Sequence, residues 1–534
     1  MMARGFLAVF VALALSGCAI GPNFKRPEVD TPAEFRGGPP LPPEPDPAAG
    51  GASEPASGDD PDGTPAAAGD DPDGTPAAAG DDPDGTPAAA GDDPDSAPAP
   101  SATVDPQTAK SLADLPWWEV FEDPVLQDLV TESLEQNYDI EIAAARTEQA
   151  RNQVIATRSA FFPQVNYQGS ARRSRYPINL LGNSQEKFTS FLGFLSAGWE
   201  IDIWGRIRRA NEAAKAELLA SEDNQRAVLL SLVSEVANLY LHLLELDAER
   251  KIALEAVQAF EGTYTLFDRK YQGGVASKLE VTRAAAAEAQ AASWVPPIEY
   301  QIAVVENRLS LLLGRPPGPI PRGRTLAEQR FLDVPPGLPS ALLERRPDIL
   351  QAEQAVVASN AAVGVAMGNF LPRVGLTALW GASSDELSNL ANGSASLWSL
   401  AGEFAGPLFR GGMLYAEYKA RVAQWEEAKA LYEQTALAAF GDVSDALVAR
   451  QRLQEERVAL QRQSEQLTES VQLSLLRYNQ GLASYFEVLQ AQQELYPALF
   501  DLAKARLAEL QAVVVLYKSL GGGWQLGTSW LPGP

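Results

Sequence analysis

The chain has 534 residues, of which 46% are hydrophobic, so it is long enough for two or more ordinary domains with a core. Acidic residues outnumber basic ones by 69 to 43, which gives a net charge of −26, and nothing in the sequence suggests nucleic-acid binding, which would need a basic stripe. Of the 69 acidic residues, 16 lie between Gly37 and Lys110 beside a single lysine, so the excess negative charge is concentrated in that segment.

The segment from Met1 to Gly17 has the pattern of an export signal, with Arg4, an apolar stretch from Phe6 to Leu15 and small residues before Cys18. The apolar stretch is too short to span a bilayer. The sequence Leu-Ser-Gly-Cys that ends at Cys18 resembles the bacterial lipoprotein processing site, which implies cleavage before Cys18 and acylation of its sulfur. Cys18 is the only cysteine, so the alternative is a free or intermolecular thiol. Ala19, in place of Asp, resembles an outer-membrane sorting address.

An acidic insert follows the N-terminal region. The unit Gly-Asp-Asp-Pro-Asp-Gly-Thr-Pro-Ala-Ala-Ala begins at Gly58, Gly69 and Gly80, and a degraded copy begins at Gly91. Two prolines in each unit break any helix, and the composition cannot bury enough apolar surface to offset chain entropy, so we predict a disordered tether. Calcium capture by Asp-Asp-Pro-Asp is the alternative, but no Glu closes the site as a calcium loop requires.

The folded part is predicted to begin near Leu115 with a short helix from Pro124 to Gln136 and a second helix, capped by Asp139, that runs to Phe161. Polar and apolar residues then alternate, which predicts the two strands of a hairpin. From Gly205 a helical pattern runs to Tyr271 without a proline, about 100 Å at the helical rise. The return helix, from Ser277 to Leu313, is expected to be interrupted at Pro296-Pro297.

A helix of this length needs a partner along it. Its apolar residues step by three and four alternately, which predicts a coiled-coil seam made of Leu229, Leu232, Val236, Leu239, Leu243 and Leu246.

The chain is duplicated around one turn motif. Lys-Tyr-Gln-Gly-Gly-Val-Ala-Ser-Lys-Leu-Glu-Val, from Lys270 to Val281, returns in register as the segment from Arg477 to Val488, with Tyr478 at the position of Tyr271. Each copy reads helix, strand, strand, very long helix, turn, helix. We expect these boundaries: signal peptide 1–17, lipidated extended N-terminus 18–36, disordered insert 37–110, first repeat 111–320, second repeat 321–524 and tail 525–534. Within the repeats we expect strands at 163–178, 187–204, 372–382 and 396–409, and long helices at 205–271 and 411–477.

The four predicted strands have about ten residues each, which suits tilted strands that cross a membrane. Lipid cannot satisfy the hydrogen bonds of an open sheet edge, so a membrane sheet must close into a barrel, and four strands cannot close. Two chains would supply eight strands, and an eight-stranded barrel is filled by its own side chains, so a dimer would not leave a channel. Three chains supply twelve strands, so a trimer is the economical prediction, with the long helices continuing the barrel as a helical tube. The predicted fold class is therefore mainly α, with a membrane β-hairpin pair in each chain.

These features resemble the outer-membrane factor family, the TolC-like channels, and most closely its lipoprotein branch typified by OprM and NodT. The resemblance covers about Cys18 to Pro27 and Leu115 to Trp524. It rests on Gly21 to Pro27 after the processing site, on Trp199-Glu200-Ile201-Asp202-Ile203-Trp204-Gly205, on Arg345-Arg346-Pro347-Asp348-Ile349, and on Leu516 to Trp524.

The resemblance implies a homotrimeric duct in the outer membrane, with its helical barrel in the periplasm. It implies the exit of a tripartite efflux system that passes small toxic compounds or drugs, with a periplasmic adaptor and an inner-membrane pump, commonly proton-driven and of the resistance-nodulation-division type, as partners. The acylated Cys18 would hold it to outer-membrane lipid, and no cofactor is implied. Type I protein or polysaccharide export remains an alternative, as does a coiled-coil lipoprotein that forms no channel.

The family's inter-helix turns lie at the periplasmic end, where they meet the adaptor and form the gate. Carried over by position, the adaptor-contact tips are Gly274, Val275, Ala276 and Ser277, with Gly481, Leu482, Ala483 and Ser484. Phe486 and Gln490 would face the axis at the constriction, where some relatives carry an acidic residue in place of Gln490. Tyr271 and Tyr478 would join neighbouring helices through their hydroxyls, with ordinary packing as the alternative.

An enzyme is disfavoured by the residues themselves. The single histidine, His242, lies in the long helix, and no second histidine completes a dyad or a metal cluster. The motifs Gly273-Gly274 and Gly521-Gly522-Gly523 lack the strand, the spacing and the lysine of a phosphate loop. Glu200 and Asp202 alternate with apolar residues, so we interpret them as lumen-facing carboxylates rather than an acid/base pair. We therefore expect no catalytic site and no metal site.

Overall fold

The computed structural model describes residues 19–29, 31–32, 35–36, 116–175, 187–330 and 341–522. The predicted signal peptide, Cys18, the acidic insert 37–110, Trp524 and the tail 525–534 lie outside the described residues.

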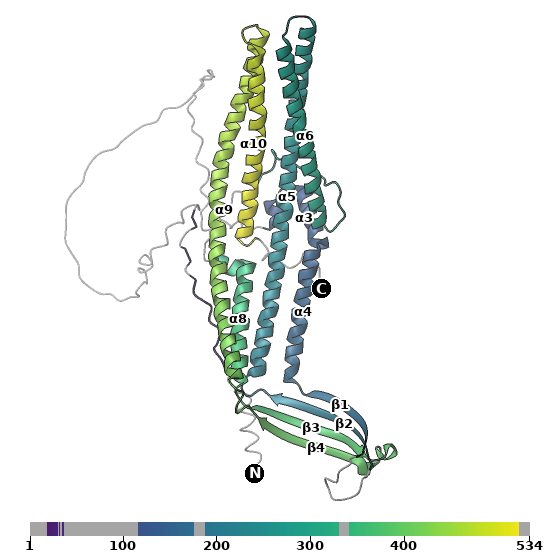
Figure 1. The fold of residues 1–534 in the computed structure, drawn as a ribbon. Helices are drawn as coiled ribbons and strands as arrows, with labels where there is room; N and C mark the ends of the chain where they lie inside the picture. Colours follow the sequence, from purple (N-terminus) through teal and green to yellow (C-terminus); the bar gives the residue numbers. More distant parts are fainter. Residues whose placement is uncertain are drawn as a thin grey trace, which may run out of the picture. The chain divides into compact units, whose positions relative to one another are not determined.

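Two pairs of helices of equal length dominate the fold (Figure 1). The long helices α5 (Arg206–Gln272) and α9 (Met413–Asn479) have 67 residues each, and the return helices α6 (Lys278–Leu312) and α10 (Tyr485–Ser519) have 35 each. The two members of each pair are separated by the same offset as the two copies of the turn motif. The other helices are α2 (Trp117–Val120), α3 (Pro124–Gln136), α4 (Tyr138–Arg158), α7 (Leu342–Arg345) and α8 (Pro347–Gly368), with short 3-10 segments η2 (Ser159–Phe161), η4 (Leu387–Asn389) and η5 (Gly393–Ala395).

Three details of the helices differ from expectation. The second long helix begins at Met413 rather than 411, because Gly411 and Gly412 have positive φ angles of 55° and 87° that a helix cannot use. Asn137, not Asp139, caps α4: its side chain accepts hydrogen bonds from the amides of Asp139 and Ile140. Pro296 and Pro297 do not interrupt α6, which packs against α5 on both sides of them, so tertiary contact outweighs the local cost of the prolines.

The strands form one antiparallel sheet in the order β1 (Gln164–Arg175), β2 (Lys187–Ile201), β3 (Arg373–Ser384) and β4 (Ser396–Ala405). Two strands are shorter than expected. β2 ends at Ile201, not 204, because Asp202 turns away to accept hydrogen bonds from the amides of Ile207 and Arg208 at the start of α5. β4 ends at Ala405, not 409, because Pro407 follows and cannot donate to a ladder.

The sheet has one mainly apolar face and one more polar face. Tyr167, Leu195, Trp380 and Trp398 are consecutive cross-strand partners, and all four side chains are exposed. The neighbouring residues along the strands point to the other face, where one row consists of Asn166, Ser196, Leu379 and Ser399. Glu200 belongs to this polar face and pairs with Arg206, with a nitrogen to oxygen distance of 2.9 Å. Asp202, which caps α5, was wrongly interpreted as facing a lumen.

The helices nearest the sheet lie side by side in the order α4, α5, α8, α9 (Figure 1). Farther from the sheet, α5 packs on α6 and α10, and α3 covers α5. All six predicted seam residues of α5 are buried in this core. One window of α5 is apolar and long enough to cross a membrane, but 61% of it is buried inside the chain, as in the core helix of a helical bundle.

Residues 19–29, which we call the N-terminal strap, lie in extended form across α5, α8 and α9. Arg209, only 4% exposed, donates to Asn23 Oδ1 at 2.9 Å, and Arg26 pairs with Glu353 at 2.6 Å. Gly205, with φ at 78°, lies so close to Ala19 that a Cβ would clash with it. The strap therefore fixes residue 19 at the junction between β2 and α5.

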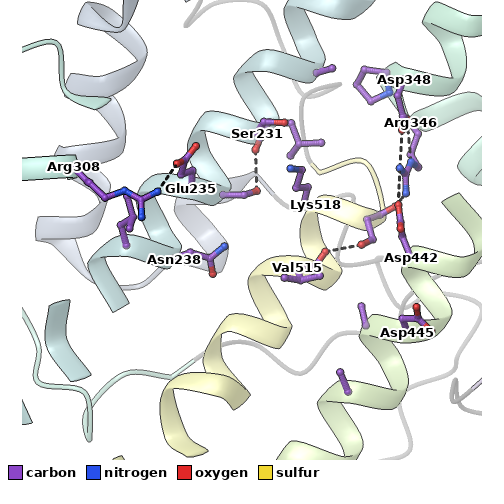
Figure 2. A pocket seen from close by; sticks show the side chains of 18 residues that line it. Ser231, Glu235, Asn238, Arg308, Arg346, Asp348, Asp442, Asp445, Val515 and Lys518 are labelled. Atoms are coloured by element: carbon purple, nitrogen blue, oxygen red, sulfur yellow. Dashed lines mark hydrogen bonds and ion pairs between the residues drawn. The ribbon is translucent and has the colours of Figure 1, made fainter. Parts of the chain in front are cut away.

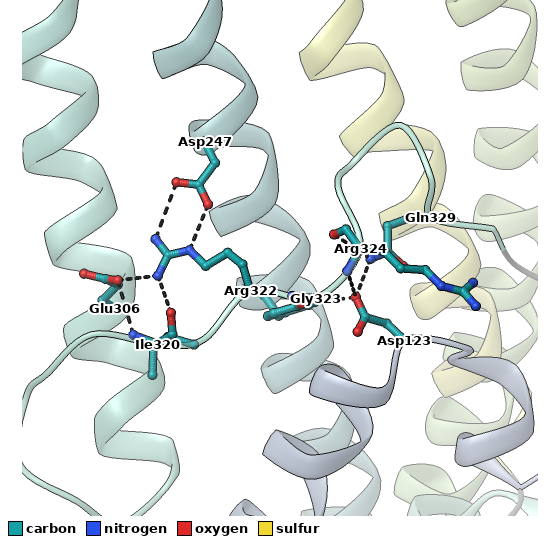
Figure 3. A network of polar contacts seen from close by, with 9 residues as sticks. Asp123, Asp247, Glu306, Ile320, Arg322, Gly323, Arg324 and Gln329 are labelled. Carbon is teal, nitrogen blue, oxygen red and sulfur yellow. Dashed lines mark hydrogen bonds and ion pairs between the residues drawn. The ribbon is translucent and has the colours of Figure 1, made fainter.

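Asp123 organises the loop that joins the two repeats (Figure 3). Its fully buried carboxylate accepts hydrogen bonds from the Tyr240 hydroxyl at 3.0 Å, the Gln329 side chain at 2.6 Å and the Arg324 amide at 3.0 Å. It also caps α3 through the amide of Val125. Beside it, Arg322 bridges Asp247 of α5 and Glu306 of α6 at 2.8 and 2.5 Å. This network ties the loop to the helical core.

We expect Asp123→Ala to destabilise the fold by about 3 kcal/mol or more, because it leaves several buried donors without an acceptor. Asp123→Asn keeps an acceptor oxygen and should cost less. Thermal unfolding in detergent, followed by circular dichroism, measures both changes. Equal melting temperatures for the alanine variant and the wild type would contradict this role of Asp123.

Candidate functional site at the inter-helix turns

The turns α5–α6 and α9–α10 have the same backbone design. Gly274 and Gly481 have φ angles of 74° and 75°. In the first turn the amide of Val275 donates to Lys270 O at 2.8 Å and the amide of Gly274 donates to Tyr271 O at 2.9 Å. The second turn repeats both bonds, from the amides of Leu482 and Gly481. This is the Schellman arrangement, and its left-handed position suits glycine.

The two turns lie at the end of the helical hairpins that is remote from the sheet (Figure 1). Val275 and Leu482, which occupy the same position in the two copies, are 80% and 68% exposed, so each turn presents an apolar side chain to solvent. Ser277 forms a capping box with Glu280. Ser484 makes no such bond, and Glu487 pairs instead with Arg477 at 3.6 Å. The helix start of the second turn is therefore less firmly held.

The two predicted tyrosines behave differently. Tyr478 joins the hairpins, because its hydroxyl accepts a hydrogen bond from Lys270 Nζ, which also lies 4.8 Å from the centre of the Tyr478 ring. Tyr271 is 42% exposed, and its ring lies 5.3 Å from Lys278 Nζ across its own turn. Lys270, missed as a site residue, stands in the opening position of the turn motif.

Phe486 and Gln490 lie one turn apart on exposed surface of α10. The Phe486 ring is 54% exposed and lies 5.5 Å from the Arg283 guanidinium of α6. Gln490 donates to Glu494 Oε1 at 3.0 Å. A carboxylate therefore stands one further turn along α10, next to the position where some relatives were expected to carry one.

Aromatic contacts between α5 and α10 hold the hairpins together behind the turns. The Phe267 and Tyr485 rings are 4.6 Å apart and the Phe260 and Tyr496 rings 5.6 Å apart. The Tyr485 hydroxyl hydrogen-bonds to Thr263, and burial raises the pKa of Tyr485 and Tyr496, so both stay neutral. We call the contact between α5 and α10, from Phe267 and Tyr485 along both helices to Glu249 and Lys504, the hairpin seam.

Farther along the hairpin seam lie two buried carboxylates of α5, Glu245 and Glu249, which are 3% and 7% exposed. Lys504 of α10 reaches Glu249 at 3.3 Å, and His242 lies 3.9 Å from Glu245. Burial, together with repulsion by Glu249, raises the pKa of Glu245 to about 8. Burial lowers the pKa of His242. Glu245 is therefore mostly protonated near neutral pH.

Because the pKa of Glu245 is raised on folding, the wild type should lose stability as pH rises from about 4.5 to about 8. Glu245→Gln, which resembles the protonated acid, should remove this loss. We expect its melting temperature to exceed that of the wild type by several degrees above pH 8 and to match it near pH 4.5. Glu261→Gln, an exposed acid on the same helix, is the control. A pH-independent difference between Glu245→Gln and wild type would contradict the assignment.

A cavity of about 930 Å³ lies where α8 begins and α10 ends, away from the turns (Figure 2). Arg346 enters it and pairs with Asp348 at 2.7 Å and Asp442 at 3.0 Å. Arg308 faces Glu235 at 3.8 Å. These ion pairs join the start of α8 to α9 and join α6 to α5, so the charges of Arg346 and Arg308 serve helix packing.

Among the residues that the structure describes, no group of three or more His, Cys, Asp or Glu side chains is arranged to hold a metal ion. The His242 side chain is 37% exposed on α5.

Comparison with known proteins gives consistent matches along the chain. The family model described as outer membrane efflux protein matches residues 129–315 and 338–522. The probable efflux pump outer membrane protein TtgC of Pseudomonas putida is 35% identical over 418 residues, which are 77% of this chain and 86% of that protein. The cation efflux system protein CusC of Escherichia coli is 33% identical over 77% of this chain and 88% of that protein. The solved structure of the outer-membrane channel OprN matches with a TM-score of 0.74 at 31% identity, covering 80% of this chain and 95% of that chain.

Proposed function

This chain belongs to the outer membrane efflux protein family, and we propose that it is the exit duct of a tripartite efflux system, carrying small toxic compounds from the periplasm to the exterior. The observation that carries the proposal is the combination of an amphipathic four-stranded sheet with two long helical hairpins in the fold of solved outer-membrane channels. The role is transport and uses no catalytic residue and no cofactor.

We infer a homotrimer from the edges of the sheet. Within the described residues, β1 and β4 each lack a partner on one side, and lipid cannot satisfy an open edge. Three chains joined from β4 to β1 give a closed barrel of twelve strands. The apolar face would meet lipid, with Tyr167, Trp380 and Trp398 among its aromatic side chains.

The proposed lipid anchor agrees with the position of the strap. Residue 19 packs at the junction between β2 and α5, so acyl chains on Cys18 would enter the membrane at the level where the strands end. Two or three acyl chains anchor firmly, at about 0.8 kcal/mol per buried methylene.

We propose that the turns are the contact with the partners. Gly274, Val275, Ala276 and Ser277, with Gly481 to Ser484, would meet a periplasmic adaptor that links the duct to an inner-membrane pump of the proton-driven resistance-nodulation-division type. Exposed Val275 and Leu482 supply apolar contact area there. Phe486, Gln490 and Tyr478, with Tyr271, would form the periplasmic gate, to which Glu494 adds a carboxylate.

Deletion of the gene should make cells accumulate a fluorescent efflux substrate, and the full chain should restore export. Photocrosslinkers placed at Val275 and Leu482 should capture the adaptor. Restored export without any crosslink to the adaptor would contradict the tip assignment, and normal export in the deletion strain would contradict the proposed role. Neighbouring genes for an ABC transporter would favour type I export instead.

A further inference from the structure

A second groove, of about 610 Å³, runs across the four helices nearest the sheet. All four of these helices, α4, α5, α8 and α9, contribute to its lining. Most of the lining is alanine, serine, asparagine or glutamine, and only three of the lining residues carry a charge: Arg146 of α4, Glu217 of α5 and Arg421 of α9. All three are exposed. Nothing in the turns or the proposed gate uses them.

The N-terminal strap shows which side of the helical layer this groove occupies. Gly21 and Ile20 of the strap lie directly against Gly364 of α8. Ala355 lines the groove, nine residues earlier on the same helix. At about 100° per residue, nine residues place Ala355 and Gly364 half a turn apart. The strap and the groove therefore lie on opposite faces of α8.

The opposite placement of strap and groove shows which face of the four helices points outward in the assembled duct. This inference rests on the proposed function. The strap leads to Cys18, whose acyl chains must lie in lipid outside the barrel. The face that the strap covers is therefore the outer one, and the groove faces the axis.

We propose that Arg146, Glu217 and Arg421 line the lumen of the duct and set its preference among charged solutes. Each chain contributes two positive charges and one negative charge at this level, so a trimer carries a net excess of three positive charges there. Arg421 donates to Gln424 at 2.9 Å, which leaves its charge unpaired by any lining carboxylate. A water-filled passage with low-dielectric walls focuses the field of such charges, so they repel cations and favour anions.

The test measures ion selectivity of the full-length protein in planar bilayers under a potassium chloride gradient. Arg146→Gln with Arg421→Gln should raise the cation-to-anion permeability ratio by about twofold or more, and Glu217→Gln should lower it. Lys215→Gln is the matched control. Lys215 lies nine residues, or half a turn, from the groove residue Asn224 on α5, so it should face outward and leave the ratio unchanged.

A second measurement tests the position of the Arg421 side chain independently of its charge. Arg421→Cys should let a bulky thiol reagent reduce conductance, whereas Lys215→Cys should not. Conducting channels in which neither the selectivity nor the block follows this pattern would overturn the lumen assignment. Wild-type protein that forms no channel would instead contradict the proposed function.

Discussion

Replacing Gly274 and Gly481 with valine in one chain should abolish efflux while the protein still assembles and inserts. Both glycines have φ angles near 75°, where a β-branched residue is strongly disfavoured, at a cost of about 1–2 kcal/mol or more at each turn. No atom lies within 4 Å of a Cβ added at either position, so the damage is confined to the backbone of the turns. Both Schellman turns would open and displace Val275 and Leu482.

Gly273 provides the control for this experiment. Its φ angle is −77°, an added Cβ would make only ordinary contacts, and the second turn has Gln480 at the same position. Gly273→Gln should therefore leave efflux intact. The double valine variant should lose adaptor crosslinking and raise substrate accumulation to the level of the deletion strain. Unchanged export by that variant would rule out the turns as the docking site.

Two arginines on the apolar face of the sheet should prevent membrane assembly. Gly193 and Ala382 are cross-strand partners on the two central strands, β2 and β3, and lie on the same face as Trp380. An arginine that faces lipid near the bilayer midplane costs about 2–4 kcal/mol. We therefore expect the double variant Gly193→Arg with Ala382→Arg to lose most of its assembled barrels from the outer membrane.

The matched control moves the same two charges to the other face. Ser170 and Ser383 both pair with Leu192, one residue along from the first pair. Ser170→Arg with Ser383→Arg should assemble normally, because those side chains would point into the water-filled lumen. The yield of heat-modifiable trimers in outer-membrane fractions, quantified on gels, is measured for both variants. Similar trimer yields from the two pairs would contradict the assignment of the faces.

The features that local patterns determine could be predicted from the sequence. The seam from Leu229 to Leu246 steps by three and four, and its burial follows from that spacing. The glycine of each turn was identifiable because the same motif occurs in both halves of the chain. Strand alternation placed Trp199 and Ile201 in a β-hairpin, although the strand ends depended on the later residues Asp202 and Pro407.

The features that depend on distant contacts could not be predicted. Pro296 and Pro297 remain in a continuous helix because α5 packs beside them. Asp123 has its partners 117 to 206 residues away, in α5 and in the loop between the repeats. The bond from Lys270 to Tyr478 joins the two copies of the motif across 208 residues. No periodicity or turn signal in the sequence encodes these long-range pairs.

The central claim is that three chains form one conducting duct. The most direct measurement is single-channel recording of the purified full-length protein in planar bilayers, on a sample whose mass in detergent has been determined. We expect a trimeric mass and discrete conductance steps that grow when the turns are opened by Gly274→Val with Gly481→Val. A monomeric protein, or a trimer that leaves bilayer conductance unchanged, would contradict it.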